Sequence, residues 1–192
     1  APLYFDLDYS EAPSIAQAEA VKLVEFFTEE LDIQSQDIKI YFSGSKGFHV
    51  IIDERALGVT PRTDLHRVYK HIAGYLRYRL GDATEKEAED GKLVEYIEPL
   101  KAVDLVVYTV KRMLRLPYSR HQKTGLYKIE LTLQQLKELT LDEIKERART
   151  GQPIQREEKT VRKRPKAGAF YADKLHEYEE AAATVSDKRN KT

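Results

Sequence analysis

Two short apolar runs near the start of the chain, residues 38–42 and 48–52, stand on either side of a turn rich in glycine and serine. Both runs consist largely of β-branched and aromatic side chains, which favour extended backbone. The residues between them, 43–47, include two glycines, which permit the tight reversal that joins neighbouring strands. The sequence therefore predicts a β-hairpin here, and any fold for this chain has to contain it.

Segments with helical periodicity lie on both sides of this hairpin. Residues 14–31 and 63–80 repeat apolar side chains every three or four positions, which predicts two amphipathic helices. The stripes consist of Ile15, Ala18, Val21, Val24, Phe27 and Leu31 in the first helix, and of Leu65, Val68, Ile72, Leu76 and Leu80 in the second, which Gly81 is expected to cap. Helices and strands that are interleaved in this way predict an α+β fold.

The other expected elements are shorter. Strands are predicted at 3–9, 100–105 and 127–131, helices at 108–114, 133–139, 141–149 and 170–183, and an acidic connection at 85–90. We expect residues 1–150 to form one folded core, and residues 151–192 to form a basic linker followed by a C-terminal helix. The chain begins at Ala1 with a strand almost at once, so we expect a fragment that lacks an N-terminal part.

The cysteine count and the charge balance exclude some kinds of site. The chain has no cysteine, so a bound metal has to rest on Asp, Glu or His, and such ligands favour Mg²⁺ or Mn²⁺. Lys+Arg and Asp+Glu number 32 each, so an overall basic footprint for nucleic acid is absent. No apolar run approaches the roughly 18 residues of a membrane span. The protein is therefore expected to be cytoplasmic.

A pair of aspartates, Asp6 and Asp8, lies in the first predicted strand. Side chains alternate along a strand, so both carboxylates point to the same side and could bind one or two metal ions. The plainer alternative is a pair of acidic residues at an exposed strand end. The pattern on its own does not choose between the two.

The turn of the predicted hairpin reads Ser-Gly-Ser-Lys-Gly-Phe-His over residues 43–49. Its glycines let the backbone approach a ligand closely, and successive N–H groups can bind an anion. Lys46 would add charge, and the hairpin would return His49 to the sheet face of Ser43. The alternative is an ordinary glycine-rich hairpin with an exposed lysine and a half-buried histidine. The spacing is not that of a Walker A loop.

The densest group of anion-binding side chains follows Asp104. Residues 111–123 are basic apart from neutral spacers and lead into a Lys-Thr-Gly turn. Pro117 is expected to end the preceding helix, so that Arg115, Ser119 and His121 can converge on phosphate oxygens. A basic surface loop would not account for the serine, the histidine and the turn. The three stretches together predict a metal-assisted site for a polyphosphate substrate.

These three stretches resemble the motifs of the archaeo-eukaryotic primase superfamily, the small-subunit primases and primase-polymerases. That family carries an acidic D-h-D/E motif on a strand, then S-G-x-x-G-h-H, then a third aspartate followed by R-h-P-x-S-x-H-x-K-T-G. The chain matches all three in this order over residues 3–131. The resemblance implies an RRM-like core with a mixed or antiparallel sheet and flanking helices. Two features depart from the family: only five residues precede Asp6, and the Cys/His zinc knuckle of many relatives cannot form.

The resemblance also implies a role for each matching residue. The catalytic metal carboxylates would be Asp6, Asp8 and Asp104, and the triphosphate of a nucleotide would contact Ser43, Lys46, His49, Arg115, Ser119 and His121, with Lys123 and Thr124 as supports. The implied reaction is DNA-dependent addition of nucleotides to a 3′-hydroxyl, with two Mg²⁺ or Mn²⁺ ions and release of pyrophosphate. Implied partners are nucleoside triphosphates, a DNA template and primer, and a helicase, a large primase subunit or another fused domain, in the cytoplasm at the nucleoid.

Two other classes of function stay open at the level of the sequence. One is a haloacid-dehalogenase-like phosphatase, with Asp6 as nucleophile, Asp8 as acid/base, and Asp82 and Asp90 as the last acidic motif. The other is a non-catalytic module that binds nucleic acid. For engaging DNA, a flexible basic arm is expected to lie along phosphates. It would consist of Arg156, Lys159, Arg162, Lys163, Arg164 and Lys166.

Overall fold

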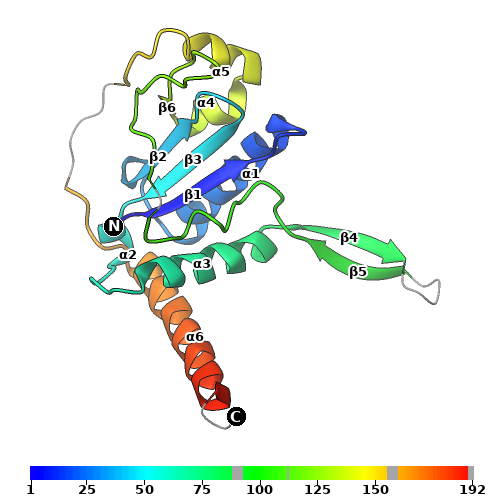
Figure 1. Cartoon of the computed structure of the whole chain (residues 1–192), viewed down its shortest axis with the longest axis vertical. Helices are drawn as coiled ribbons and strands as arrows, with labels where there is room; N and C mark the ends of the chain where they lie inside the picture. Colours follow the sequence, from blue (N-terminus) through cyan, green and yellow to red (C-terminus); the bar gives the residue numbers. More distant parts are fainter. Residues whose placement is uncertain (88–92, 112, 155–159, 190–192) are drawn as a thin grey trace.

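A four-stranded antiparallel sheet in the order β1-β3-β2-β6 forms the centre of the molecule (Figure 1). The computed structural model describes residues 1–87, 93–111, 113–154 and 160–189. Its strands are β1 (Leu3–Asp8), β2 (Ile38–Phe42), β3 (Gly47–Ile52), β4 (Asp82–Glu87), β5 (Leu93–Glu98) and β6 (Ile129–Leu131). Its α-helices are α1 (Pro13–Glu25), α2 (Glu54–Leu57), α3 (Leu65–Arg79), α4 (Leu133–Glu138), α5 (Leu141–Arg147) and α6 (Pro165–Arg189). The α+β class is confirmed.

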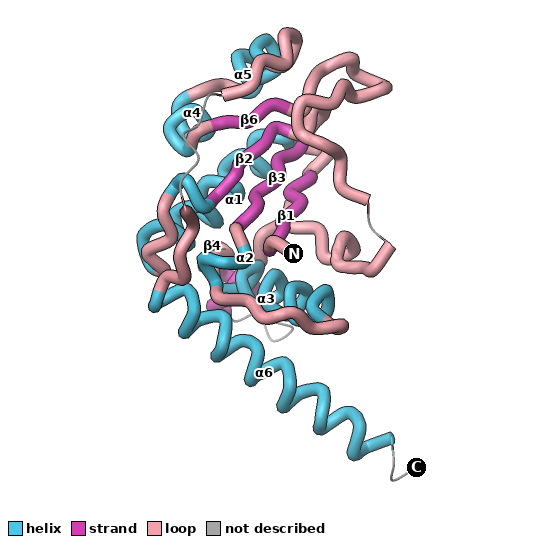
Figure 2. The backbone as a smooth tube through the Cα atoms, turned by 90° about the vertical axis from the view of Figure 1, so that its left-hand side faces the viewer, coloured by secondary structure: helices cyan, strands magenta, loops and turns pink. Residues whose placement is uncertain are grey.

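The predicted hairpin is present as β2 and β3, with Ile40 opposite Val50. One face of the sheet is apolar and belongs to the core, which includes Phe5 of β1 and Ile129 of β6. Helix α1 packs against β1 and β3 on this face. Long loops lie beside the strands on the side away from α4 (Figure 2). The face of the sheet opposite α1 is therefore left for polar groups.

Helix α1 is where the sequence predicted it, and one turn of π-helix, Phe26–Glu30, extends it. The predicted stripe is confirmed at Val24, Phe27 and Leu31, which are buried. It is wrong in the first turns, where Ala18 is exposed and the buried residues are Ala16, Glu19, Ala20 and Leu23. Residues spaced by three drift around a helix of 3.6 residues per turn, so they cannot share one face. The stripe of α3 takes one step of three and then steps of four, which keeps it on one side of the helix, and its Val68, Ile72 and Leu76 are buried as predicted.

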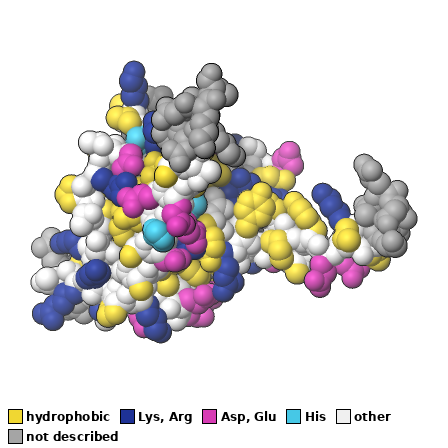
Figure 3. Space-filling view, turned by 90° about the horizontal axis from the view of Figure 1, so that it is seen from below, with side chains coloured by type: hydrophobic (Ala, Val, Ile, Leu, Met, Phe, Trp, Pro, Cys, Tyr) yellow, Lys and Arg dark blue, Asp and Glu magenta, His cyan; other side chains and the backbone are white. Residues whose placement is uncertain are grey.

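The segment after α3 differs most from the expectation. The predicted acidic connection at 85–90 lies partly in β4, which pairs with β5 in a separate two-stranded sheet, while residues 88–90 lie outside the described residues. The C-cap of α3 is Leu80 rather than Gly81, although the N–H of Gly81 donates to the carbonyl oxygen of Tyr78 at 3.1 Å. A Cβ on Gly81 would lie 2.3 Å from the carbonyl oxygen of Glu98, so the glycine permits close approach of the two segments. The β4–β5 hairpin projects from the body and exposes apolar side chains, including Leu93 (67% exposed) (Figure 3).

Two elements predicted between residues 100 and 114 are not formed as expected. The strand expected at 100–105 is reduced to one antiparallel bridge, between Val103 and Leu7. The helix expected at 108–114 is absent from the described residues there, which form turns. Val107, Thr109 and Val110 are β-branched and favour helix weakly, and the Tyr108 hydroxyl donates to the carbonyl oxygen of Tyr4 at 2.6 Å. The segment is therefore shaped by its contacts with β1.

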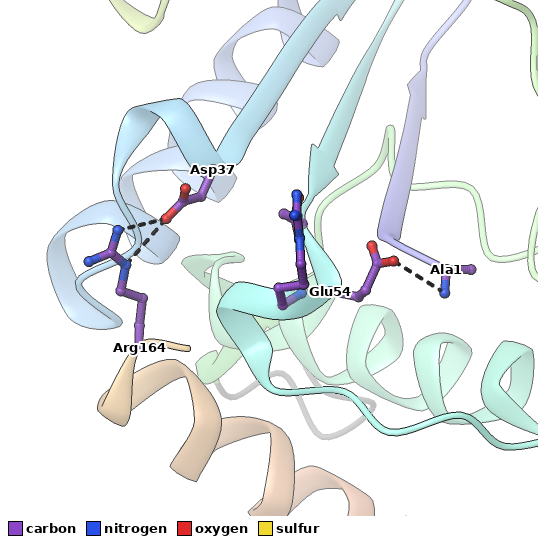
Figure 4. A network of polar contacts seen from close by, with 6 residues as sticks. Ala1, Asp37, Glu54 and Arg164 are labelled. Carbon is purple, nitrogen blue, oxygen red and sulfur yellow. Dashed lines mark hydrogen bonds and ion pairs between the residues drawn. The ribbon is translucent and has the colours of Figure 1, made fainter. Parts of the chain in front are cut away.

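The last helix begins five residues earlier than predicted, at Pro165, and its first turns pack on α2 and α3. Arg164 donates from Nε and Nη2 to Oδ2 of Asp37, a carboxylate whose side chain is 0% exposed (Figure 4). Lys166 pairs with Asp32. The flexible basic arm is therefore wrong for Arg164 and Lys166, whereas Arg156 and Lys159 lie outside the described residues. Every described helix is too short or too polar to cross a lipid bilayer.

Candidate active site

The polar face of the sheet carries a row of functional side chains. Leu3, Phe5 and Leu7 of β1 point into the core, so Tyr4, Asp6 and Asp8 point to the other side. Asp6 is directly opposite His49 on β3, His49 is opposite Tyr41 on β2, and Tyr41 is opposite Glu130 on β6. Directly opposite residues share a face. The sheet therefore aligns groups from all four strands in one row.

The third aspartate joins this row at the free edge of β1. The N–H of Asp8 donates to the carbonyl oxygen of Ala102 at 2.8 Å, and the N–H of Asp104 donates to the carbonyl oxygen of Asp6 at 2.9 Å. Alternation about the bridge at Val103 places Asp104 on the same face as Asp6 and Asp8. Oδ1 of Asp104 accepts from the N–H of Val106 at 2.7 Å. Asp104 thus shares one face with Asp6 and Asp8, from which it is far apart in sequence.

A cavity of about 250 Å³ opens over this face. Its lining comprises Tyr4, Asp6, Asp8, Ser43, Ser45, Lys46, Gly47, His49, Met113, Leu114, Arg115 and His121. All predicted site residues are among them except Asp104 and Ser119. The Ser119 hydroxyl instead donates to the carbonyl oxygen of Leu116 at 2.7 Å and so holds the turn. The three motifs of the sequence meet in one cavity.

The Ser43 turn is held by its own hydroxyl. Oγ of Ser43 accepts from the N–H of Ser45 at 3.4 Å and from the N–H of Gly47 at 3.2 Å. Gly44 has φ of +84°, which only glycine adopts without strain. A Cβ on Gly47 would lie 2.4 Å from the carbonyl oxygen of Leu7. The two glycines therefore let the turn close and let β3 approach β1.

The third motif is fastened to this turn. Nη1 of Arg115 donates to the carbonyl oxygen of Ser43 at 3.0 Å, and the Thr124 hydroxyl donates to that of Gly44. Nδ1 of His121 accepts from the N–H groups of Lys123 at 3.2 Å and Thr124 at 3.3 Å. The remaining proton of a neutral imidazole then resides on Nε2. Burial, followed by the charges of Arg115 and Lys123, lowers the pKa of His121, so its Nε2 is a neutral hydrogen-bond donor.

Basic side chains lie next to the carboxylates of the cavity. Nε2 of His49 lies 3.6 Å from Oδ1 of Asp6, and Nζ of Lys46 lies 3.3 Å from Oδ1 of Asp8. The Lys46 ammonium also donates to the hydroxyl of Ser10. The contact between His49 and Asp6 is largely buried, with side chains 10% and 18% exposed, whereas the ion pair of Lys46 and Asp8 is half-exposed and therefore screened by water.

The donor set fits a hard divalent cation in its chemistry. Asp6 and Asp8 line the cavity and offer the carboxylate oxygens that Mg²⁺ and Mn²⁺ take. Within the described part of the chain, no three acidic or histidine side chains are gathered closely enough to form a ready-made metal site. Asp104, whose Oδ1 is bonded to Val106, would have to turn toward the other two to complete such a site.

Sequence reasoning missed several residues that build the site. Lys128 is 1% exposed, and its Nζ donates to the carbonyl oxygen of Arg115 at 2.9 Å and lies 4.8 Å from the ring centre of Tyr41. Burial lowers the pKa of Lys128 to about 8. The alternation in 127–131 could have revealed it, because Ile129 and Leu131 face the core and Lys128 therefore faces the site. Tyr4 follows from the same rule on β1.

The acidic residues required by the phosphatase alternative do not join the cavity. Asp82 lies on β4 and pairs with Lys22 at 2.5 Å, outside the lining of the cavity. Asp90 lies outside the described residues. The segment 115–121, which that alternative leaves without a role, contributes Arg115 and His121 to the lining. The geometry therefore favours the combination of motifs found in primases.

Comparisons with known proteins agree with this geometry. Residues 5–133 match the family model of the DNA primase small subunit. The DNA primase small subunit PriS of Pyrobaculum calidifontis is 34% identical over 138 residues, which cover 63% of this chain and 44% of the relative. The small subunit PriS of Thermoplasma volcanium is 29% identical over 178 residues, which cover 69% of this chain and 53% of the relative. That of Archaeoglobus fulgidus is 27% identical over 176 residues, which cover 66% of this chain and 52% of the relative. The chain spans about half the length of these curated relatives. Because the family model covers more than half of the 192 residues, the chain belongs to the DNA primase small subunit family.

Proposed function

We propose that this chain carries the catalytic site of a DNA primase, which joins nucleotides to a 3′-hydroxyl on a DNA template and releases pyrophosphate. The observation that carries the proposal is the shared cavity: Asp6 and Asp8, the Ser43 turn, and the pair Arg115 and His121 line it together. The relatives of similar sequence bear the name DNA primase small subunit. The site and the family together support these substrates and this reaction.

The carboxylates would form one half of the site. Asp6, Asp8 and Asp104 would hold two Mg²⁺ or Mn²⁺ ions. Their position on one face of the sheet supports this role. Such ions, when bound, neutralise charge on the transferred phosphate and make the attacking hydroxyl more acidic. The backbone hydrogen bond from the N–H of Asp104 to the carbonyl oxygen of Asp6 keeps these two residues side by side on neighbouring segments. Lys46 and His49, their present partners, would then turn to the anionic substrate.

The other half of the site would bind the triphosphate. The guanidinium of Arg115 can offer two parallel N–H groups to phosphate oxygens. Nε2 of His121 donates a further hydrogen bond, because Nδ1 is occupied by backbone N–H groups. The carbonyl oxygen of Ser43 holds Arg115 directly. The carbonyl oxygen of Gly44 holds the hydroxyl of Thr124, whose N–H donates to Nδ1 of His121. Positioning and charge stabilisation would then account for the chemistry, without a dedicated general base.

The finer features of the fold and its partners are also proposals. The chain order β1-α1-β2-β3, with residues 102–104 on the outer edge of β1, supports an RRM-like core. We place the catalytic core in residues 1–150 and treat 151–192 as an attached segment, which is anchored to the core through Arg164. A DNA template and primer, nucleoside triphosphates, and a large primase subunit, a helicase or another fused domain would be the partners.

Templated incorporation tests the proposal. The full-length protein, supplied with a single-stranded DNA template, labelled nucleoside triphosphates and Mg²⁺ or Mn²⁺, is expected to form a labelled polymer whose synthesis depends on template and cation. Binding of DNA without any polymer under both cations would support the non-catalytic alternative. Release of phosphate from simple esters, without polymer, would support a phosphatase. Either result would overturn the proposal.

A further inference from the structure

A buried glutamate on α1 has no part in the site as described so far. Glu19 is 6% exposed and lies among the apolar residues Ala16, Ala20 and Leu23. Its Oε1 accepts from the N–H of Lys101 at 2.7 Å. The other oxygen, Oε2, accepts from the N–H of Ala102 at 2.8 Å. One carboxylate thus holds two consecutive backbone N–H groups across more than 80 positions of sequence.

The backbone that Glu19 holds leads directly to the third aspartate. The carbonyl oxygen of Ala102 accepts from the N–H of Asp8, and two residues later the N–H of Asp104 donates to the carbonyl oxygen of Asp6. The segment is not part of a regular strand, since it meets β1 at the single bridge of Val103. A segment with so few ladder bonds depends on other contacts for its register.

The segment that Glu19 holds has a second point of attachment in α3. The N–H of Leu100 donates to the carbonyl oxygen of Arg77 at 2.9 Å, and Nε of Arg77 donates to that of Leu100 at 3.1 Å. Residue 100 is therefore fixed from α3, and residues 101 and 102 from α1. Beyond Asp104 the described backbone forms turns, so these attachments hold the segment on its N-terminal side.

The chemistry of a carboxylate suits this position better than that of its neutral analogue. A glutamine has one acceptor oxygen and would direct its NH₂ group at the other backbone N–H. The fit has a cost, because burial raises the pKa of Glu19 despite the opposing effect of both backbone hydrogen bonds. A buried carboxylate is in itself weak support for stability. Its two bonds serve better to fix where the segment lies.

We propose that Glu19 is a positioning residue for the metal-binding carboxylates, which sets the register of residues 101–104 on β1 and so keeps Asp104 beside Asp6. The inference rests on the proposed function, since it concerns the same carboxylates. It assigns to α1 a task beyond packing under the sheet. The residue acts through the backbone of the third motif and does not itself contact the cavity.

The test compares Glu19→Gln and Glu19→Asp with Glu25→Gln in the full-length protein. Glu25 lies on the same helix and makes a partly exposed ion pair with Lys137, so it is a matched control. Without any divalent cation, both Glu19 variants are expected to lose amide-exchange protection at residues 101 and 102. Their Mn²⁺ affinity, followed by electron paramagnetic resonance, should fall at least tenfold, and kcat should fall by roughly ten- to a hundredfold. The KM for nucleotide should stay within twofold of the wild type, and Glu25→Gln should match the wild type throughout.

The outcomes separate the two proposals. Asp104→Asn is measured beside these variants; if it incorporates nucleotides normally, the proposed role of the third carboxylate fails. If Asp104→Asn is inactive while both Glu19 variants keep wild-type Mn²⁺ affinity and kcat, only the positioning role is wrong. If neither Glu19 variant folds, Glu19 is a residue of general stability and the inference is likewise overturned.

Discussion

The ammonium group of Lys128 donates a hydrogen bond of 2.9 Å to the main-chain carbonyl oxygen of Arg115. Lys128 is almost completely buried beneath the third motif, and Arg115 lines the cavity. Nη1 of Arg115 in turn bonds the carbonyl oxygen of Ser43. A lysine next to β6 thereby supports the backbone of the arginine that joins two motifs.

Replacement of Lys128 by methionine should weaken nucleotide binding with little loss of folding. Methionine fills the space of the lysine stem but leaves the carbonyl oxygen of Arg115 without its donor. A hydrogen bond to a charged group contributes about 1.5–3 kcal/mol, so the KM for nucleotide should rise roughly tenfold or more. Lys39→Met is the control, since Lys39 is exposed on β2. An unchanged KM in Lys128→Met would show that Arg115 is held by other contacts.

His121 should titrate below its ordinary pKa of 6.5. Burial and the nearby charges of Arg115 and Lys123 disfavour the protonated ring in the folded protein. The folded state therefore binds fewer protons than the unfolded state, so this group's contribution to stability is complete above pH 6.5 and decreases as the pH falls below it. Nitrogen-15 NMR should find the neutral ring protonated on Nε2. A pKa above 6.5, or a proton on Nδ1, would contradict the assigned hydrogen bonds.

Two glycine-to-alanine changes should have opposite effects on stability. In Gly47→Ala the new Cβ would lie 2.4 Å from the carbonyl oxygen of Leu7, so β1 and β3 must separate; the free energy of unfolding should fall by more than about 2 kcal/mol. In Gly74→Ala nothing lies within 4 Å of the new Cβ, and alanine in a helix should add about 1 kcal/mol. Urea unfolding measures both. Equal stability of the two variants would refute the close contact at Gly47.

Loss of the Arg164 side chain should destabilise the whole protein. Arg164→Met leaves the fully buried carboxylate of Asp37 without its partner, and breaking a buried pair costs about 3–5 kcal/mol. The exposed pair of Lys166 and Asp32 contributes at most about 1 kcal/mol, so Lys166→Met is the control. Truncation after Thr150 should be as harmful as Arg164→Met, as thermal unfolding can show. A truncated protein as stable as the wild type would show that residues 151–192 are separable.

Elements whose pattern is local were predictable. The hairpin of β2 and β3 and the stripe of α3 follow from periodicity, and the two capping residues Thr132 and Thr140 start α4 and α5 as sequence rules expect. The β4–β5 hairpin was missed because β4 consists largely of charged residues, and its extended form depends on its pairing with β5. The turns around Tyr108 were missed because a hydroxyl bond to β1 replaces the helix.

The candidate site divides in the same way. Asp6, Ser43 and His121 belong to compact motifs, so their chemical roles could be predicted from the sequence before their positions were known. Glu19 and Lys128 are isolated charges whose role depends on backbone groups brought to them by the tertiary fold. The only trace in the sequence is a charged residue on an otherwise apolar stripe or strand. Such a trace indicates burial, and it does not identify the partner.

The central claim is that the cavity over β1 is the site of nucleotide transfer. Its most direct test is DNA-templated nucleotide incorporation by full-length Asp6→Asn, with Asp82→Asn as the control, since Asp82 pairs with Lys22 outside the cavity. We expect Asp6→Asn to fold, because it relieves the charge concentrated near Asp8, and to lose incorporation by at least a thousandfold, roughly 4 kcal/mol of transition-state stabilisation. Asp82→Asn should match the wild type. Incorporation by Asp6→Asn at a rate close to that of the wild type would contradict the account.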